Sequence, residues 1–189
     1  MRISGGTLKG RNIGTRKAFL NKPDGSELRP TPAKVREAIF DILRGVIEGS
    51  SLLDLYAGTG AVGIEALSMG AGRVVFVEES AARSGIIKES VSRFGFSEKA
   101  LVVRDRVQDF LKKNEERFDI VFMDPPYASE ETIYVATMID RLETVGDDGI
   151  VIAEHSSKRA LPDHAGALTL KKRYKYGDTS LSLYVKGGQ

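Results

Sequence analysis

Four residues in the second half of the chain combine an acid, two prolines and an aromatic ring: Asp124-Pro125-Pro126-Tyr127. They follow the apolar run Phe118–Met123, which predicts a strand covered on both faces, as in a parallel sheet. Open α/β sheets bind ligands at the carboxyl ends of such strands. Each proline also keeps the residue before it extended, so the Asp124 carboxylate and the Pro125 carbonyl become rigid hydrogen-bond acceptors. A plain β-turn that ends the strand is the simpler alternative.

These groups suit a reaction at the exocyclic amine of a nucleobase. That amine is a poor nucleophile because its lone pair is delocalised into the ring, so an enzyme that methylates it must orient it toward the methyl donor. Orientation contributes up to about 7–11 kcal/mol, and stacking on Tyr127 adds about 1–3 kcal/mol. We predict Asp124, Pro125, Pro126 and Tyr127 as catalytic residues. Asp124 would chiefly position the amine and stabilise charge, and would act late as a base.

A glycine-rich turn lies further toward the N-terminus, where the strand Ser51–Leu55 meets a predicted helix. Its glycines form a G-x-G-x-x-G pattern, which by itself indicates only a tight turn above a helix N-terminus. Asp54 adds a carboxylate at the tip of the strand, where it could bind an ammonium group. The predicted cofactor-binding residues of this turn are Asp54, Gly58, Thr59, Gly60 and Gly63.

Two more acids end the next predicted strands. Glu78 follows the turn by about 20 residues, where an acid can hold ribose hydroxyls, and Asp105, with Arg106 beside it, could accept from the amine of adenine. The three strand ends together predict an adenosine pocket. Both NAD and S-adenosylmethionine contain adenosine, but an acid at Asp54 suits an amino group and would repel a pyrophosphate. The pattern therefore favours S-adenosylmethionine.

Alternating strands and helices would position these residues. Apolar runs predict parallel strands at Ser51–Leu55, Arg73–Val77, Leu101–Val103, Phe118–Met123 and Gly149–Glu154. Helices are predicted between them, at Ala61–Met69, Ala81–Phe94, Val107–Asn114 and Glu130–Glu143. Leu168–Lys175 and Thr179–Val185 alternate like a closing antiparallel pair. Thr31 and Pro32 predict the capped start of an earlier helix, and the glycine-broken start of the chain predicts a small hairpin. The fold class is α/β.

Charge is unevenly distributed along the 189 residues, although the net charge is only +2. Met1–Arg36 holds nine of the 28 Lys and Arg residues and two of the 26 Asp and Glu residues. This asymmetry indicates that the basic end either meets a polyanion or is a solvated terminus.

Composition excludes several classes of site and protein. The chain has no cysteine, so disulfides, thiolate metal sites and a cysteine nucleophile are excluded, and the last of these rules out C5 methylation of pyrimidines. The two histidines have no carboxylate partners at ligand spacing, and we expect no metal. With no apolar run of membrane-spanning length and no segment like a signal peptide, we expect a cytoplasmic location.

With the glycine turn and Asp124–Tyr127 in this order, the chain resembles the class I S-adenosylmethionine-dependent N-methyltransferases. Further motifs resemble the RsmD family of 16S rRNA guanine-N2 methyltransferases. They are Arg2–Gly6 with Gly10-Arg11, Arg29–Thr31 with Val35–Phe40, Asp54–Gly60, Gly63–Ser68 and Tyr176–Thr179. The resemblance spans nearly the whole chain.

The resemblance implies a Rossmann-like, mostly parallel sheet of seven strands with an antiparallel last pair. It implies a methyltransferase domain at residues 31–189, preceded by a basic extension at residues 1–30. The substrate would be a guanine of 16S rRNA in a partly assembled small subunit, and we expect the protein to act as a monomer. The residues that would grip RNA phosphates are Arg2, Lys9, Arg11, Arg16, Lys17, Lys22 and Arg29.

The sequence also allows three other functions. A DNA adenine or cytosine N-methyltransferase shares the quartet but usually needs a target-recognition region. Between Tyr127 and the end of the sheet, this chain adds only a helix and short loops to the predicted strands. A nicotinamide oxidoreductase leaves Asp124–Tyr127 unexplained. A non-catalytic RNA-binding assembly factor would not need Asp124. The choice of guanine depends on the N-terminal and helix motifs, because the quartet does not distinguish guanine from adenine or cytosine.

Overall fold

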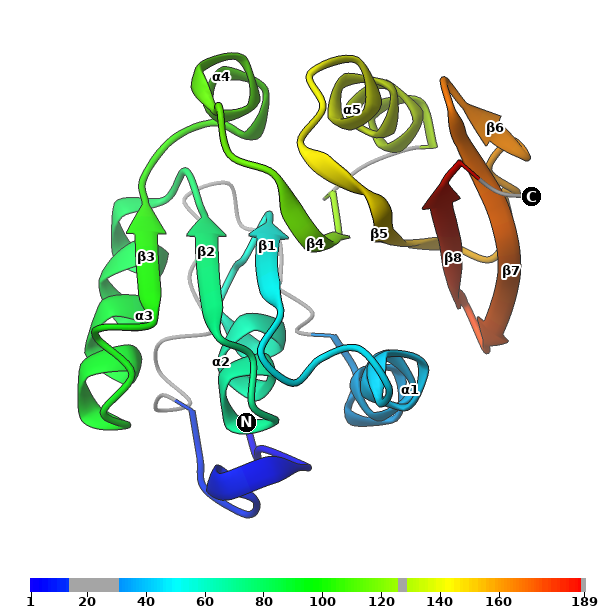
Figure 1. The fold of residues 1–189 in the computed structure, drawn as a ribbon. Coiled ribbons are helices and arrows are strands. Elements are labelled where there is room, and N and C mark those ends of the chain that lie inside the picture. The colour runs from blue at the N-terminus through cyan, green and yellow to red at the C-terminus, as the bar shows by residue number, and fades with distance from the viewer. Residues whose placement is uncertain (14–30, 126–128, 188–189) are drawn as a thin grey trace.

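A single mixed sheet forms the centre of the protein. A computed structural model describes residues 1–13, 31–125 and 129–187, and helices cover both faces of its sheet (Figure 1). The strands are β1 (Ser51–Leu55), β2 (Arg73–Val77), β3 (Ala100–Val103), β4 (Phe118–Met123), β5 (Val145–Ser156), β6 (His164–Ala165), β7 (Leu168–Tyr176) and β8 (Thr179–Lys186). The helices are the 3-10 turn η1 (Gly6–Leu8) and the α-helices α1 (Ala33–Leu43), α2 (Ala61–Ser68), α3 (Ala81–Arg93), α4 (Val107–Lys113) and α5 (Ser129–Arg141).

The strand order is β3-β2-β1-β4-β5-β8-β7-β6. The first five strands are parallel, while β8 lies antiparallel between β5 and β7. The predicted α/β fold with a mostly parallel sheet and an antiparallel closing pair is confirmed. The described sheet has eight strands where we expected seven, because the short β6 pairs with β7 at the edge. A two-residue strand is too short to produce an alternating pattern in the sequence.

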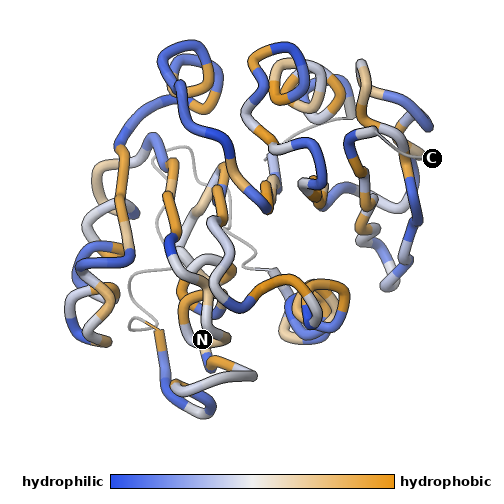
Figure 2. Tube along the Cα trace, in the orientation of Figure 1, coloured by the Kyte–Doolittle hydropathy of each residue, from blue (hydrophilic) through white to orange (hydrophobic). Residues whose placement is uncertain are grey.

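Alternate residues of the central strands enter two separate cores. Leu52 of β1 packs with side chains of α1, α2 and α3, and its neighbour Leu53 packs with side chains of α4 and α5. Figure 2 shows apolar segments along the central strands. This two-sided burial is the reason that β1 and β4 appear in the sequence as continuous apolar runs.

Helix α1 starts one residue later than the sequence indicated. The helix begins at Ala33, Pro32 occupies the N-cap position, and no side chain caps the helix. The prediction that Thr31 caps this helix is therefore wrong. The Thr31 side chain instead lies near Glu154 of β5, where it lowers the pKa of that carboxyl.

Residues 1–13 form a compact turn that packs against helix α2. One antiparallel bridge joins Arg2 to Asn12, and Ile3, Leu8 and Ile13 are buried. The expected N-terminal hairpin is thus present in a short form. None of the described helices is long and apolar enough to cross a membrane.

Candidate active site at the strand tips

The carboxyl ends of β2, β1, β4 and β5 lie side by side and bring four acids to one edge. The register pairs Leu55 with Val77 and Met123, and Met123 with Ala153. Asp124 and Glu154 are therefore the next residues on adjacent strands. Side chains in register on parallel strands point to the same face. The four acids at this edge are Asp54, Glu78, Asp124 and Glu154.

Asp54 lies inside the protein at the tip of β1, and its side chain is 1% exposed. Its Oδ2 accepts a hydrogen bond of 3.0 Å from the amide of Gly63. Burial raises the pKa of Asp54 to about 7, the Gly63 bond lowers it, and the charges of Asp124 and Glu78 raise it further. An acid in this state would bind a cationic group strongly, because a cation replaces the solvation that burial removes.

The glycine turn owes its shape to left-handed backbone at Gly58 (φ +57°) and Gly60 (φ +74°). A Cβ at Gly60 would meet Ile87 Cγ1 at 3.0 Å, so the turn lies close to α3. A Cβ at Gly63 would meet Phe76 Cε1 at 2.2 Å. Gly63 therefore allows close packing of α2 on β2, and it contributes to the site through its amide. Thr59 is buried in the same turn.

Glu78 at the end of β2 holds this turn in place. The carboxylate accepts from the Gly58 amide at 2.9 Å, from the Ser80 amide at 2.8 Å and from Arg83 Nε at 2.8 Å. An ionised carboxylate has about four acceptor positions, so one position remains for a ligand. In the described residues, Glu78 thus fixes the glycine turn as well as facing the edge of the sheet.

Asp105 and Arg106 lie at the outer end of this edge, after β3. Asp105 accepts from Lys113 Nζ at 2.9 Å and from the Arg106 amide at 2.9 Å. The Lys113 bond is the main reason that the pKa of Asp105 is lowered. Arg106 is exposed and occupies the N-cap position of α4. Asp105 is half-buried, as Gly58 is, and Arg106 is the most exposed of the predicted cofactor residues.

Asp124 follows β4 and is partly buried, with Pro125 buried beside it. Burial raises the pKa of the Asp124 carboxyl to about 7. Pro126 and Tyr127, the other two predicted catalytic residues, lie outside the described residues. The described half of the quartet therefore places a desolvated acid at the tip of β4, on the face shared with Asp54 and Glu154.

Glu154 lies in β5 and is not among the site residues predicted from the sequence. It is 7% exposed, and its Oε2 is a buried atom with no hydrogen-bond partner in the part of the chain that the structure describes. Burial is the main reason that its pKa is raised; the charge of Asp124 raises it further, while the Thr31 side chain lowers it. The signal in the sequence was an acid at the end of a strand, the same feature that identified Asp54, Glu78, Asp105 and Asp124.

Tyr56 links the glycine turn to the start of α5. It has a positive φ of 61°, which is unusual for a residue other than glycine. Its hydroxyl donates to Glu131 Oε1 at 2.9 Å, and Gln108 Nε2 donates to the same oxygen at 3.1 Å. These bonds join β1, α4 and α5 near the edge where the acids lie, and such strained residues often occur at functional sites.

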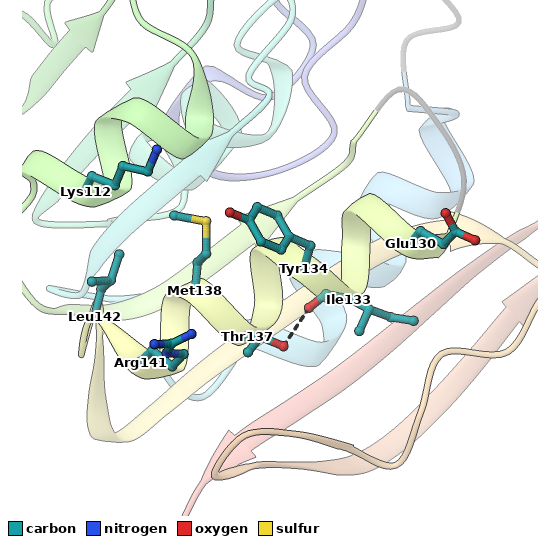
Figure 3. A pocket seen from close by; sticks show the side chains of 8 residues that line it. All are labelled: Lys112, Glu130, Ile133, Tyr134, Thr137, Met138, Arg141 and Leu142. Atoms are coloured by element: carbon teal, nitrogen blue, oxygen red, sulfur yellow. Dashed lines mark hydrogen bonds between the residues drawn. The ribbon is translucent and has the colours of Figure 1, made fainter.

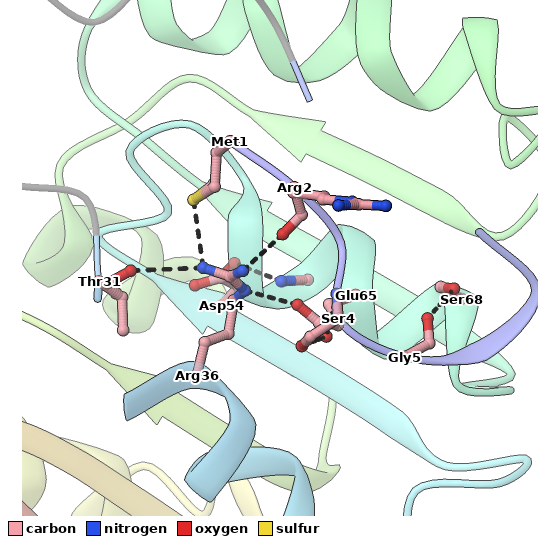
Figure 4. A network of polar contacts seen from close by, with 10 residues as sticks. Met1, Arg2, Ser4, Gly5, Thr31, Arg36, Asp54, Glu65 and Ser68 are labelled. Carbon is pink, nitrogen blue, oxygen red and sulfur yellow. Dashed lines mark hydrogen bonds and ion pairs between the residues drawn. The ribbon is translucent and has the colours of Figure 1, made fainter. Parts of the chain in front are cut away.

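The N-terminal segment is anchored by a buried ion pair between α1 and α2. Arg36 Nε lies 2.5 Å from Glu65 Oε2, and Arg36 Nη2 donates to the Arg2 carbonyl at 2.7 Å (Figure 4). Ser4 donates its amide to Glu65 Oε1 at 3.0 Å. Arg2, Lys9 and Arg11 are exposed on this anchored segment. The other basic candidates lie outside the described residues: Arg16, Lys17, Lys22 and Arg29.

A hollow of about 640 Å³ between α4 and α5 lies away from these acids. Lys112, Tyr134 and Met138 are among the residues that line it (Figure 3). The side chains that line this hollow belong to α4, α5 and the turn after α5, and none of them is one of the four acids at the strand tips. His155 of β5 forms a hydrogen bond of 2.9 Å between its Nε2 and Ser182 Oγ.

The described residues contain no cluster of three or more acids or histidines suited to a metal ion.

Comparison with known proteins gives relatives over the whole chain. A family model described as Conserved hypothetical protein 95 matches residues 1–185. YlbH of Bacillus subtilis (strain 168), provisionally named as an rRNA methyltransferase, is 34% identical over 191 residues, with 100% of both chains covered. Ribosomal RNA small subunit methyltransferase D of Escherichia coli (strain K12) is 30% identical over 192 residues, with 100% of this chain and 91% of the relative covered.

A solved structure confirms the likeness in three dimensions. The Escherichia coli protein yhhF, provisionally described as a methyltransferase, matches with a TM-score of 0.83 and 26% identity. The match covers 100% of this chain and 99% of that chain. The fold and the N-terminal segment are therefore shared over the full length.

Proposed function

Since the chain belongs to the family described as Conserved hypothetical protein 95, and within it to the RsmD methyltransferases, we propose that it methylates the N2 amine of a guanine in 16S rRNA. S-adenosylmethionine would be the methyl donor. The main support for methyl transfer is the pair of desolvated acids at adjacent strand tips, Asp54 and Asp124. Asp54 suits a cationic cofactor, and Asp124 suits an amine substrate.

The acids at the strand tips fit the donor because it is a cation. Asp54 is buried and forms no ion pair within residues 1–13, 31–125 and 129–187, so an ammonium group would supply the charge that it lacks. Gly58 and Gly60 would let the donor approach the backbone, Glu78 would hold its ribose, and Asp105 with Arg106 would bound its adenine. When bound, S-adenosylmethionine supplies a methyl group on a sulfonium, which becomes a neutral thioether as the amine nitrogen takes the methyl.

Asp124 and Pro125 would hold the guanine amine. The Asp124 carboxylate and the Pro125 carbonyl would each accept one N2–H, which fixes the direction of the nitrogen lone pair. The methylated amine is acidic, and Asp124 would take the proton that it loses. Pro126 and Tyr127 would complete the site for the amine. The proline would keep Pro125 extended, and the tyrosine ring would stack on the base.

The basic extension at residues 1–30 would bind the RNA backbone. Arg2, Lys9 and Arg11 present exposed cations on a segment that the Arg36–Glu65 pair fixes to the catalytic domain at residues 31–189. Arg16, Lys17 and Arg29 would extend this surface. Each phosphate contact releases counterions, so RNA binding would weaken as salt rises. We propose a monomer that uses no metal.

Mass-spectrometric mapping of ribosomal RNA tests the proposed function. In cells that lack the gene, one N2-methylguanosine should disappear from the small-subunit RNA, and the wild-type gene should restore it. Asp124→Ala should not restore it, whereas Asp148→Asn, a change at an exposed acid, should. An unchanged methylation pattern without the gene would refute the proposal. Restoration by Asp124→Ala would indicate an assembly factor that has no catalytic role.

A further inference from the structure

The tip of β5 carries an acid that the proposed function has not used. β4 and β5 are parallel and pair Met123 with Ala153, so Asp124 and Glu154 are the next residues on adjacent strands. Glu154 is also paired with Leu181 of β8, and Leu181 belongs to the core that α1, α2 and α3 cover. Phe122 belongs to that same core. Glu154 and Asp124 therefore face the same side of the sheet, next to each other.

One oxygen of the Glu154 carboxyl makes no hydrogen bond with any described residue. The residue is 93% buried, the Thr31 side chain lowers its pKa, and Oε2 has no hydrogen-bond partner among the described residues. Buried polar atoms without partners are rare in folded proteins because their desolvation is uncompensated. Such an atom beside a predicted catalytic acid indicates a group that is satisfied by a ligand.

Thr31 is itself held by the N-terminal network. Arg36 Nη1 donates to the Thr31 carbonyl at 3.4 Å, and Arg36 is fixed by its buried pair with Glu65. This contact holds the backbone of Thr31 near Glu154, where the Thr31 side chain lowers the pKa of the carboxyl. The fold thus orients the Glu154 carboxyl and leaves Oε2 available.

We propose that Glu154 is a specificity-determining residue that accepts the N1–H of the target guanine while Asp124 accepts from the N2 amine. This inference rests on the proposed function, because it concerns the same site. Guanine has two adjacent donors on its Watson–Crick edge, N1–H and the N2 amine. Adenine and cytosine instead have a ring nitrogen with a lone pair beside the amine. Two neighbouring carboxyl acceptors therefore match guanine and oppose the other two bases.

The electrostatics of the pair agree with this arrangement. Glu154 and Asp124 disfavour each other's ionised form, in addition to the effect of burial. Two N–H donors from the base would favour the ionised form, so guanine satisfies both acids at once. The quartet alone does not distinguish guanine from adenine, and Glu154 supplies that missing distinction.

A pair of substrates that differ in N1–H and O6 tests the role of Glu154. One RNA carries guanosine at the position identified by mapping, and the other carries 2-aminopurine riboside, which keeps the N2 amine but lacks both N1–H and the O6 carbonyl. Because the loss of O6 is the same for the wild type and for Glu154→Gln, the change in preference between the two enzymes reports the N1–H contact. Methyl transfer is measured as kcat/KM for the wild type and for Glu154→Gln. We expect the wild type to prefer guanosine by about 100-fold or more, because the analogue leaves Glu154 unpaired. Glu154→Gln should reduce the preference at least about tenfold, because an amide can accept from N1–H or donate to N1.

The ratio between the two enzymes removes the intrinsic reactivity of each base. Equal preference in Glu154→Gln and the wild type, or no preference in the wild type, would overturn the role of Glu154 and leave the proposed function intact. If the wild type methylates neither RNA, the proposed function fails together with this inference. The wild-type comparison needs no variant, so it stays decisive even if Glu154→Gln does not fold.

Two controls separate recognition from a structural defect. Glu154→Gln should bind S-adenosylhomocysteine like the wild type in calorimetry, since Glu154 is assigned to the base and not to the cofactor. Glu98→Gln, at an exposed glutamate, should keep the wild-type preference for guanosine. Thr31→Val removes the hydroxyl near Glu154, and it should lower the preference by less than Glu154→Gln does.

Discussion

The protein contains desolvated carboxylates of two kinds, those that form an ion pair and those that do not. Glu65 and Glu78 each face a guanidinium, with Arg36 Nε at 2.5 Å and Arg83 Nε at 2.8 Å. Asp54, Asp124 and Glu154 form no ion pair with any described residue, and burial raises the pKa of each. The paired acids hold elements together, and of the two only Glu78 also lies at the strand tips with an acceptor position left for a ligand. The unpaired acids make no such ion pair and are available to ligands. A cationic partner, more than burial, therefore marks the acids that stabilise the fold.

The largest expected effect follows from breaking a paired acid. Arg36→Met leaves Glu65 buried without its cation, and we expect the free energy of unfolding to fall by about 3–5 kcal/mol. Urea denaturation measures it. Arg44→Met is the matched control, because Arg44 pairs with Asp41 on the surface and should change stability by less than about 1 kcal/mol. Equal losses in the two variants would contradict the distinction.

Replacing an acid that forms no ion pair should reduce activity without reducing stability. Asp124→Asn keeps the shape of the side chain but removes the carboxylate that positions the amine, so we expect kcat to fall about 10²–10³-fold. The free energy of unfolding should stay the same or rise, because the buried acid has no cationic partner among the described residues. Radiolabelled methyl transfer to small subunits and urea denaturation measure the two effects. A large loss of stability would place Asp124 among the structural acids.

Protonation of Asp54 should couple cofactor binding to pH. The folded-state pKa of about 7 lies above the ordinary value of 3.8, so the folded protein keeps a proton that the unfolded chain releases. Without ligand, the free energy of unfolding should therefore decrease as pH rises from about 4 to 7. Affinity for S-adenosylhomocysteine should increase, by about 30-fold between pH 5.5 and 8, because the ammonium group needs the ionised carboxylate. Calorimetry across this range measures it, and Asp54→Asn should show a flatter profile.

The smallest expected effect concerns Tyr56, the residue with a positive φ that follows β1. Tyr56→Phe removes the hydroxyl that donates to Glu131, and we expect a loss of about 1 kcal/mol in the free energy of unfolding. Thermal denaturation measures it. Tyr134→Phe, at an exposed tyrosine, should change nothing. A Tyr56→Phe variant as stable as the wild type would show that the bond does not join the glycine turn to α5.

The central strands could be read from the sequence because each is buried on both faces. Ser51–Leu55, Arg73–Val77 and Phe118–Met123 have the same bounds in the structure as in the prediction. The fifth strand starts earlier than expected, at Val145 instead of Gly149, and its pairing with β4 is irregular between Phe118 and Ile120. Polar residues in that bulged start, Asp147 and Asp148, hide it from any search for apolar runs.

Single-residue roles were harder to predict than strands. Gly63 matches a ligand-binding pattern, but its lack of a side chain is required by contact with Phe76, which lies on β2. Thr31 has the sequence features of a helix cap, but Pro32 occupies the N-cap position and Thr31 lies near Glu154 of β5. In both cases a partner distant in the sequence decides the role, and local patterns carry no information about that partner.

Composition, apolar runs and the acids that end the strands determined the fold class, the cofactor type and the quartet Asp124–Tyr127 as a site for an amine. These features are local, because burial and strand termination depend on neighbouring residues. Only the tertiary structure decided which buried acids are paired and that Glu154 lies beside Asp124 with a free oxygen. The physical reason is that the pKa and hydrogen bonding of a buried carboxyl depend on groups brought together by the sheet register, which the sequence does not display.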